Sequence, residues 1–352
     1  MGKTTDNRSA TNRFERSTMP IGMRNYRIRH DLERDSLDGF DLPLGVVSAD
    51  RRAPVQGYTL SYVPGEEDEP DSYAFHVVVT HPRVAPILHK AFELLPPEVV
   101  GIVEIGSRDA YRTVDVYLGA SPVSRRRFLA TWRRFEPLLL EECLVAAGAN
   151  SEEPFIEIFL DQWKGIGIHV PLGMRDDVEA MLTSFGLEEV IETWPIADDE
   201  SSETEPEIRP VLELVDEFSP DLDELILELR HDWALELNVD PERNADESGR
   251  NLGYTLWHAV VIVENANGNP DDGAYASIWA TANSLAEMET LIDVALEDNQ
   301  QWEFGEVYTI DRVAFDERPN ELVDLPPRRD LSEVHLVNFE AWKSPPKGVA
   351  GD

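Results

Sequence analysis

Apolar positions alternate between two periods along the first half of the chain. Short runs such as AFHVVVT, residues 74–80, are typical of buried strands, whereas residues 84–95 repeat apolar side chains at helical spacing. A second helix is expected from Ser121 to about Ala147. The strands expected in this half are residues 74–80, 99–105, 113–118 and 155–161. The resulting order, β-α-β-β-α-β, is the split βαβ or ferredoxin-like arrangement.

The same reasoning extends this half and assigns a second one. A strand over 165–171, a helix ending near Gly186 and a strand over 188–194 form a β-α-β extension. The second half is expected to contain a helix that starts at Ser219-Pro220, strands over 254–264, 274–282 and 306–315, and a helix capped by Ser284. The pattern therefore predicts an α+β protein of two domains. The first is ferredoxin-like with the extension, and the second is a smaller antiparallel sheet packed with helices.

Polar and proline-rich segments set the expected domain boundaries. Residues 195–210, PIADDESSETEPEIRP, carry six acids and one arginine and predict a solvated linker. Residues 1–30 have a net charge of +5 and predict a basic, disordered arm. The expected parts are the arm 1–30, a first domain 31–194, an acidic linker 195–210, a second domain 211–342 and a disordered tail 343–352.

Charge is the most unusual feature of the composition. The chain has 69 Asp and Glu against 31 Lys and Arg, a formal net charge of −38, and only 5 of the 31 cations are lysines. Such a field repels nucleic acids and anionic lipid surfaces, so we expect neither partner. Scarce lysine with abundant Asp and Glu fits a salt-adapted proteome, and the preference for arginine also fits a GC-rich genome. In either case the acidity is a property of the organism rather than of the function.

Motifs that would indicate an enzyme or a cofactor are absent from the sequence. There is no P-loop, dinucleotide-binding, HExxH or GxSxG pattern, and Cys143 stands alone. A single cysteine forms no intrachain disulfide and no cysteine-based zinc site, so a reducing cytoplasm is the natural compartment. We expect no cofactor and no metal. The sequence does not indicate an oligomeric state.

The stretch GASPVSRRRFLATWRRF, residues 119–135, places five arginines on one helix of this acidic chain. At about 100° per residue, the apolar side chains form one face and the arginines lie on the face turned away from the core. Arginines and hydroxyls at the start of a helix suit a phosphate or a carboxylate. The candidate binding residues are Ser121, Ser124, Arg125, Arg126, Arg127, Arg133 and Arg134. The partner would be an acidic protein segment or a phosphorylated small molecule.

An intramolecular interpretation of the same helix is the main alternative. The arginines would then pair with the protein's own acids, either Glu136, Glu141 and Glu142 nearby or the acidic linker folding back. Each exposed pair of this kind contributes only ~0.2–1 kcal/mol.

A second constellation depends on how the strands pair. Strand alternation sends His76, Glu104, Asp115 and Glu157 to the sheet face opposite the helices. A histidine among three carboxylates could serve acid/base chemistry or hold a divalent metal, but an open sheet face of a very acidic protein carries acids in any case. The sequence therefore favours a non-enzymatic binding or interaction module. The alternative is an enzyme that acts on a small anionic substrate through this cluster, and a structural protein without a small ligand is the third reading.

Overall fold

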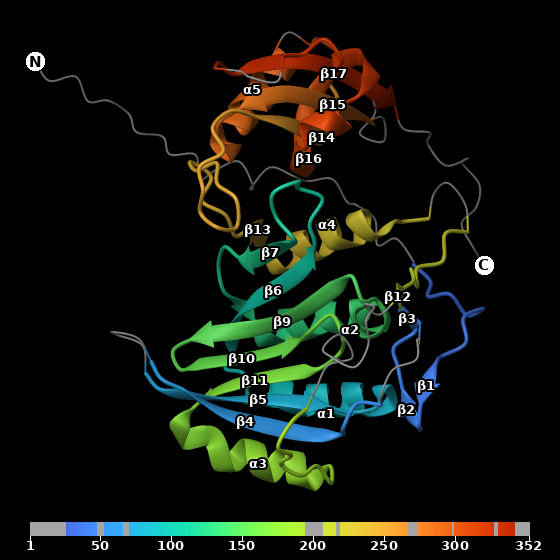
Figure 1. The fold of residues 1–352 in the computed structure, drawn as a ribbon, viewed down its shortest axis with the longest axis vertical. Helices are drawn as coiled ribbons and strands as arrows, with labels where there is room; N and C mark the ends of the chain where they lie inside the picture. The colour runs from blue at the N-terminus through green and yellow to red at the C-terminus, as the bar shows by residue number, and fades with distance from the viewer. Residues whose placement is uncertain are drawn as a thin grey trace, which may run out of the picture. The chain divides into compact units, whose positions relative to one another are not determined.

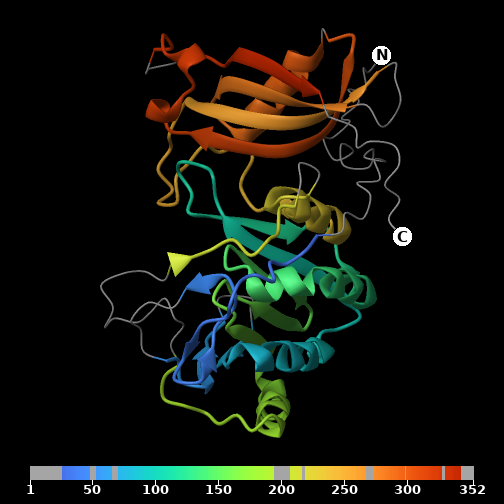
Figure 2. The same cartoon turned by 90° about the vertical axis from the view of Figure 1, so that its right-hand side faces the viewer.

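The computed structural model describes residues 26–47, 53–65, 70–193, 207–215, 219–266, 273–297, 299–326 and 330–341. The chain is a mixed α/β protein whose described residues form several sheets and five α-helices (Figure 1, Figure 2). Contacts divide it into two units. The larger unit spans Asn25–Ser107 and Val114–Asn238, and the smaller unit contains Arg108–Thr113 and the described chain after Asn238.

An antiparallel sheet forms the centre of the larger unit. Its order is β13-β7-β6-β9-β10-β11-β5-β4, with the short β8 (Val123–Ser124) beside β6. The strands are β4 (Gly57–Val63), β5 (Ser72–Val78), β6 (Glu98–Gly106), β7 (Val114–Gly119), β9 (Val145–Glu152), β10 (Phe155–Leu160), β11 (Ile166–Pro171) and β13 (Leu235–Leu237). The four strands predicted for the split βαβ arrangement are present as β5, β6, β7 and β10, but only β6 and β7 are direct neighbours.

Two helices, α1 (Val84–Ala91) and α2 (Arg125–Glu141), cover one face of this sheet and lie behind it in Figure 1. Phe128 and Trp132 of α2 contact Phe92 and the fully buried Trp233, with the Phe128 and Trp233 rings 4.7 Å apart. Burial of one such side chain stabilises the fold by about 1.5–3 kcal/mol. The apolar face predicted for α2 is therefore correct, and the arginines are turned away from the core.

The predicted length of the second helix is wrong. Helix α2 ends at Glu141, with Pro137 inside it, and the alanine-rich residues that follow form β9. β9 lies between β6 and β10, where Ala147 and Ala149 are buried. A Cβ on Gly148 would lie 2.2 Å from the carbonyl oxygen of Ile158, so this strand requires its small residues.

One further expectation in this unit is corrected and another is confirmed. The stretch 188–193 is not a strand, because Glu189 makes only an isolated bridge to Tyr58. The remaining residue of that prediction, Trp194, lies outside the described residues. The helix expected to end near Gly186 is present as α3 (Arg175–Ser184), and Gly186 just after it adopts a φ of +71°, which is typical of a glycine that ends a helix.

Helix α4 (Leu222–Trp233), expected in the second domain, packs in the larger unit instead. Leu225, Leu229 and Trp233 belong to the same buried cluster as α2, which explains the position of the helix. Asp221 caps it through a capping box with Glu224, in place of the predicted Ser219-Pro220 start.

The N-terminal end of the described chain also packs on α2. The Tyr26 hydroxyl donates to the carbonyl oxygen of Arg134 at 2.8 Å, and its ring lies parallel to that of Phe135 at 6.0 Å. Residues 26–30 are therefore placed, in contrast to the predicted arm 1–30, and residues 1–25 lie outside the described residues. The predicted tail 343–352 also lies outside them.

Two short two-stranded sheets also belong to this unit. β1 (Ser36–Leu37) pairs with β2 (Phe40–Asp41). β3 (Val46–Val47) pairs with β12 (Glu207–Ile208), which belongs to the segment expected as a linker. Residues 195–206 of that segment lie outside the described residues.

The smaller unit is an antiparallel sheet with one α-helix among its described residues. The sheet order is β16-β14-β15-β17, and helix α5 (Leu285–Glu297) buries Met288, Ile292 and Leu296 against one face. The strands are β14 (Thr255–Asn265), β15 (Gly273–Ala282), β16 (Trp302–Val313) and β17 (Glu333–Ala341). The first three strands and the helix confirm the sequence prediction, whereas β17 was not expected. No described helix of either unit is long and apolar enough to cross a membrane.

Candidate functional site

Helix α2 begins three residues later than the sequence predicted. Ser124 is the N-cap, and its hydroxyl accepts a hydrogen bond from the Arg127 amide at 3.2 Å. Val123 and Ser124 pair with β6 as the short strand β8, so the helix starts at Arg125. The expected cap, Ser121, is exposed and lies before this strand.

Three of the five arginines contact groups of the larger unit itself. The Arg125 guanidinium donates to the carbonyl oxygens of Glu93 and Leu95. Arg127 reaches the carbonyl oxygen of His231 at 3.5 Å.

Arg134 is the most tightly held of these three. Its guanidinium lies 3.0 Å from Glu228 and 3.1 Å from Asp232, both on α4. Glu228 is buried, whereas Arg134 is one third exposed. The pairing predicted with the protein's own acids therefore exists for Arg134, although its partners come from α4 and not from the three acids named.

Those three acids make other contacts. Glu136 accepts hydrogen bonds from the Trp132 indole and from His89. Glu141 binds Arg34, and Glu142 accepts from the Val211 amide.

The two remaining arginines, Arg126 and Arg133, form what we call the arginine face. Both side chains are exposed, and within the described part of the chain neither makes a hydrogen bond or an ion pair. They are two helical turns apart, about 10 Å along the axis, with the small, exposed Ala130 between them. This helix thus presents to solvent, on one stripe, two guanidinium groups that have no partner among the described residues.

The second predicted cluster is only partly assembled. His76 on β5 accepts or donates a hydrogen bond with Thr193 at 3.0 Å, and its Nε2 lies 3.6 Å from Asp161 at the end of β10. Burial raises the pKa of Glu104, and the nearby charges of Glu157 and Asp161 raise it further. Burial also raises the pKa of Glu157. Carboxylates from β6 and β10 therefore share the open sheet face with His76, as predicted.

Asp115 is on the other face of the sheet. It pairs across the hairpin with Ile105, while its neighbour Val116 pairs with Glu104. The Asp115 side chain is buried and accepts a hydrogen bond from Ser107 at 2.8 Å. No set of three His, Cys, Asp or Glu side chains in the described ranges is arranged to hold a metal ion.

Two residues near His76 were not identified from the sequence. Asp161 closes the β10–β11 turn by accepting from the amides of Trp163 and Gly165, at 2.7 and 2.9 Å. The letters DQWKG, an aspartate four residues before a glycine, are the signal that could have indicated this turn.

Lys164 in the same turn is buried at a φ of +67°. Its ammonium donates to the carbonyl oxygens of Glu142 and Val145, at 2.7 and 2.9 Å, and burial lowers its pKa. The cavity beside it, also lined by Asp41, His81 and Trp163, has a volume of about 20 Å³, enough for about one water molecule. Lys164 therefore anchors the start of β9 and does not face a ligand-sized space.

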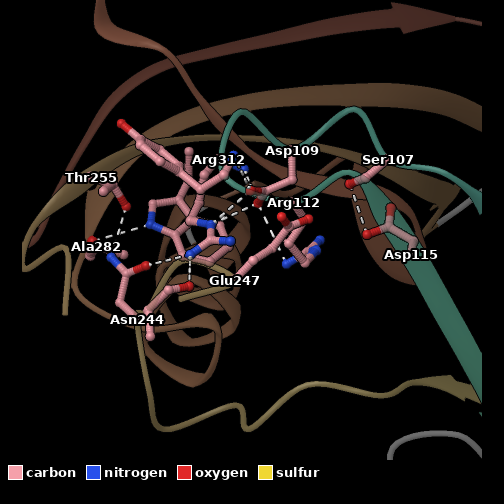
Figure 3. Close-up of polar contacts among 12 residues, drawn as sticks. Ser107, Asp109, Arg112, Asp115, Asn244, Glu247, Thr255, Ala282 and Arg312 are labelled. Carbon is pink, nitrogen blue, oxygen red and sulfur yellow. Dashed lines mark hydrogen bonds and ion pairs between the residues drawn. The ribbon is translucent and has the colours of Figure 1, made fainter. Parts of the chain in front are cut away.

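A buried polar network lies in the smaller unit (Figure 3). Asp109 accepts hydrogen bonds from Nε of Arg312 at 2.7 Å and from the Arg312 amide at 2.9 Å. Arg312 also donates to Asn244, whose amide group donates to Thr255 at 2.9 Å. Both members of the ion pair are almost fully buried. The amide, Nε and Nη1 of Arg312 all donate to protein oxygens, so we interpret this network as a structural element.

Comparison with known proteins identifies no relative. No protein-family model matches the chain, and no curated protein or solved structure gives a significant match.

Proposed function

We propose that the protein is a non-catalytic binding module that contacts an acidic segment of a partner protein through the arginine face. The observation that carries this proposal is the exposure of Arg126 and Arg133 without an ion pair in the described residues of a chain with 69 acids. Acids are abundant, yet none of the described ones pairs with these two guanidinium groups. Their planar forks match carboxylates and bind them bidentately.

The geometry favours an extended partner over a small anion. Arg125, Arg127 and Arg134, which would have to converge with the other two on a phosphate, are held by other groups. Ser124 is engaged as the helix cap. Two guanidinium groups about 10 Å apart instead suit carboxylates spaced along a peptide. The proposal includes a cytoplasmic location and no binding of nucleic acid, both supported by the composition alone.

A two-domain organisation with a ferredoxin-like first domain also stays part of the proposal. The chain order β5-α1-β6-β7-α2-β10, with β9 inserted between α2 and β10, supports it. The pairing of β5 with β4 and β11 is an addition to that arrangement.

Charge reversal tests the arginine face. We expect the double variant Arg126→Glu/Arg133→Glu to weaken binding of a synthetic oligoglutamate peptide by about tenfold or more at low salt, measured by calorimetry. Its melting temperature should stay close to that of the wild type, because neither side chain has a partner in the described residues. The control Arg27→Glu/Arg250→Glu changes the net charge equally at two exposed positions elsewhere.

Three results would contradict the proposal. They are no peptide binding by the wild type, equal losses in the reversal variant and the control, or a large fall in melting temperature in the reversal variant. The last result would assign the arginines to intramolecular pairing. Inorganic phosphate in a parallel titration separates the small-anion alternative from the peptide.

The enzyme alternative is retained on one observation, the approach of His76 to Asp161 beside Glu104 and Glu157. A carboxylate next to an imidazole can orient it for proton transfer. Asp115 drops out of this candidate because it lies on the other face. Replacement of His76 by Gln should abolish any turnover found in a substrate screen, and unchanged turnover would exclude this cluster.

A further inference from the structure

Strand β4 is at one end of the large antiparallel sheet, and β5 pairs with only one of its edges (Figure 1). In an antiparallel pair, alternate residues direct both peptide groups toward the same neighbouring strand. Tyr58 directs its groups away from β5, since its N–H donates to the Glu188 carbonyl oxygen at 3.2 Å and its C=O accepts from the Val190 amide at 2.9 Å. Leu60 and Tyr62 therefore present their N–H and C=O groups on the same outer edge.

The chain itself pairs with only the beginning of this outer edge. A segment that follows α3 makes an isolated parallel bridge to Tyr58 through Glu189 and then leaves the strand. Within the described ranges, no hydrogen bond reaches the outer peptide groups of Leu60 or Tyr62. Ser61 and Tyr62 are exposed, and the Tyr62 side chain is 54% accessible. The part of the edge at Leu60 and Tyr62, which we call the free edge, thus continues the line of the parallel segment.

The side chains of β4 do not prevent another strand from pairing. Natural proteins protect edge strands with charged residues, proline, a β-bulge or a covering helix. β4 reads GYTLSYV, without a charged residue or a proline, and its register with β5 is uninterrupted. Helix α3, which lies next to β4 in Figure 1, packs into the core through Val178 and Leu182 and leaves Ser61 and Tyr62 exposed. An edge of this kind is a template for an extended chain.

Carboxylates lie at the end of the free edge where the parallel segment leaves it. Glu189 and Glu192 are exposed, and neither makes an ion pair in the described part of the chain. Glu192 directly precedes Thr193, whose hydroxyl lies 3.5 Å from that of Thr59 on β4. A strand on the free edge therefore meets two acids at one end, and a lysine or arginine at that end complements them.

We propose that the free edge of β4 binds an extended segment of a partner protein by strand addition, with a basic residue of that segment next to Glu189 and Glu192. In this mode main-chain hydrogen bonds supply the affinity, and alternate side chains of the added strand supply the specificity. Leu60 and Tyr62 offer apolar contacts to the added strand, because cross-strand neighbours have Cβ atoms about 4.5–5.5 Å apart. The proposal goes beyond the arginine face, which lies on α2 and takes an acidic partner.

Two other occupants fit the free edge less well. A second copy of the chain would bring together two bodies that each have a net charge of −38. An acidic segment, such as the one proposed for the arginine face, would meet Glu189 and Glu192 with charge of the same sign. A basic extended segment is favoured in both respects.

Calorimetry on the full-length protein tests the proposal with a synthetic peptide of alternating lysine and valine. The same peptide with every backbone amide N-methylated keeps the charges and the side chains but donates no backbone hydrogen bond. We expect the methylated peptide to bind about tenfold more weakly or worse, because strand addition depends on these bonds. General attraction to an acidic chain would hold both peptides equally.

Substitutions at Leu60 test the edge itself. Leu60→Pro removes an N–H that has no partner among the described residues, and edge strands tolerate proline. We expect about tenfold weaker binding of the lysine–valine peptide at an unchanged melting temperature. The matched control Leu60→Ala keeps the N–H and should retain most of the affinity. Glu189→Gln/Glu192→Gln should weaken binding more than Glu152→Gln/Glu153→Gln, which removes two exposed acids elsewhere in the larger unit.

The comparison of the two peptides uses the wild-type protein, so it decides the case in which Leu60→Pro does not fold. The proposal is overturned if the wild type does not bind the lysine–valine peptide, if both peptides bind equally, or if Leu60→Ala loses as much affinity as a folded Leu60→Pro. Dimers in sedimentation, without peptide binding, would assign the free edge to a second copy of the chain and overturn it as well.

Discussion

Asp109 and Arg312 are 203 positions apart in the chain and form a buried ion pair in which Nε of Arg312 lies 2.7 Å from the Asp109 carboxylate. The same carboxylate accepts from the amides of Arg312 and Tyr111, both at 2.9 Å. A buried carboxylate that accepts several hydrogen bonds loses little on leaving water, because each lone pair is satisfied. Removal of one partner leaves the other charge buried without compensation.

We therefore expect Asp109→Ala to lower the free energy of unfolding by about 3–5 kcal/mol. The measurement is urea unfolding followed by tryptophan fluorescence. The control, Arg250→Ala, removes an exposed ion pair with Asp246 and should cost about 0–1 kcal/mol. Equal losses in the two variants would show that the buried pair contributes no more to the free energy of unfolding than the exposed pair does.

Two arginines of α2, Arg126 and Arg134, lie about two helical turns apart and should respond differently to truncation. Arg134→Ala removes the guanidinium that binds buried Glu228, so we expect a loss of about 1–3 kcal/mol in the free energy of unfolding. Arg126→Ala removes an exposed side chain without a partner in the described residues and should change it by about 0.5 kcal/mol or less. Thermal unfolding of both variants at one salt concentration measures the difference, and a larger loss for Arg126 would contradict the assignment of the arginine face to solvent.

How far the sequence predicts this structure depends on whether each side-chain pattern has one interpretation. The apolar stripe of α2 has one, and its buried Phe128 and Trp132 lie where the pattern placed them. The segment after Glu141 fits both a helix and a strand. Its residues VAAGANS are buried on both faces of the sheet, so they show neither the strand period nor the helix period. Tertiary packing between β6 and β10 makes that choice.

The candidate sites show the same limit. Strand alternation was expected to place Asp115 on the face opposite the helices, but β7 faces the helices with Asp115 and Tyr117. Arg230 of α4 lies over the Tyr117 ring at 4.9 Å. Both sides of this strand are partly covered, so hydrophobicity alone does not select the inner face. Two contacts leave no periodic signal in the sequence, because they depend on strand order and on the path of the chain. They are the approach of Asp161 to His76 and the pairing of Asp109 with Arg312.

Glu157 should make stability depend on pH in a defined direction. Burial raises its native pKa above the value of 4.5 for an exposed glutamate, so the native state holds more protons than the unfolded state above that pH. The free energy of unfolding therefore falls as pH rises from 4.5 through the native pKa, because the buried carboxyl group of Glu157 becomes charged. Glu157→Gln removes this penalty and should raise the midpoint of urea unfolding at pH 7.

The gain from Glu157→Gln should disappear near pH 3, where the carboxyl is protonated in both states. Urea unfolding of the wild type and the variant between pH 3 and pH 7 measures this pH dependence. A constant difference at all pH values would attribute the effect to the hydrogen bond with Asn150 rather than to charge burial.

The assignment of residues 108–113 to the smaller unit has a consequence for modularity. The carboxylate that neutralises Arg312 comes from a six-residue excursion of the chain between β6 and β7, which belong to the larger unit. A gene fragment that starts at Val239 would encode the whole four-stranded sheet and yet lack Asp109. A single cut in the chain therefore does not yield the complete smaller unit. Any exchange of this unit between proteins would have to include residues 108–113 as well.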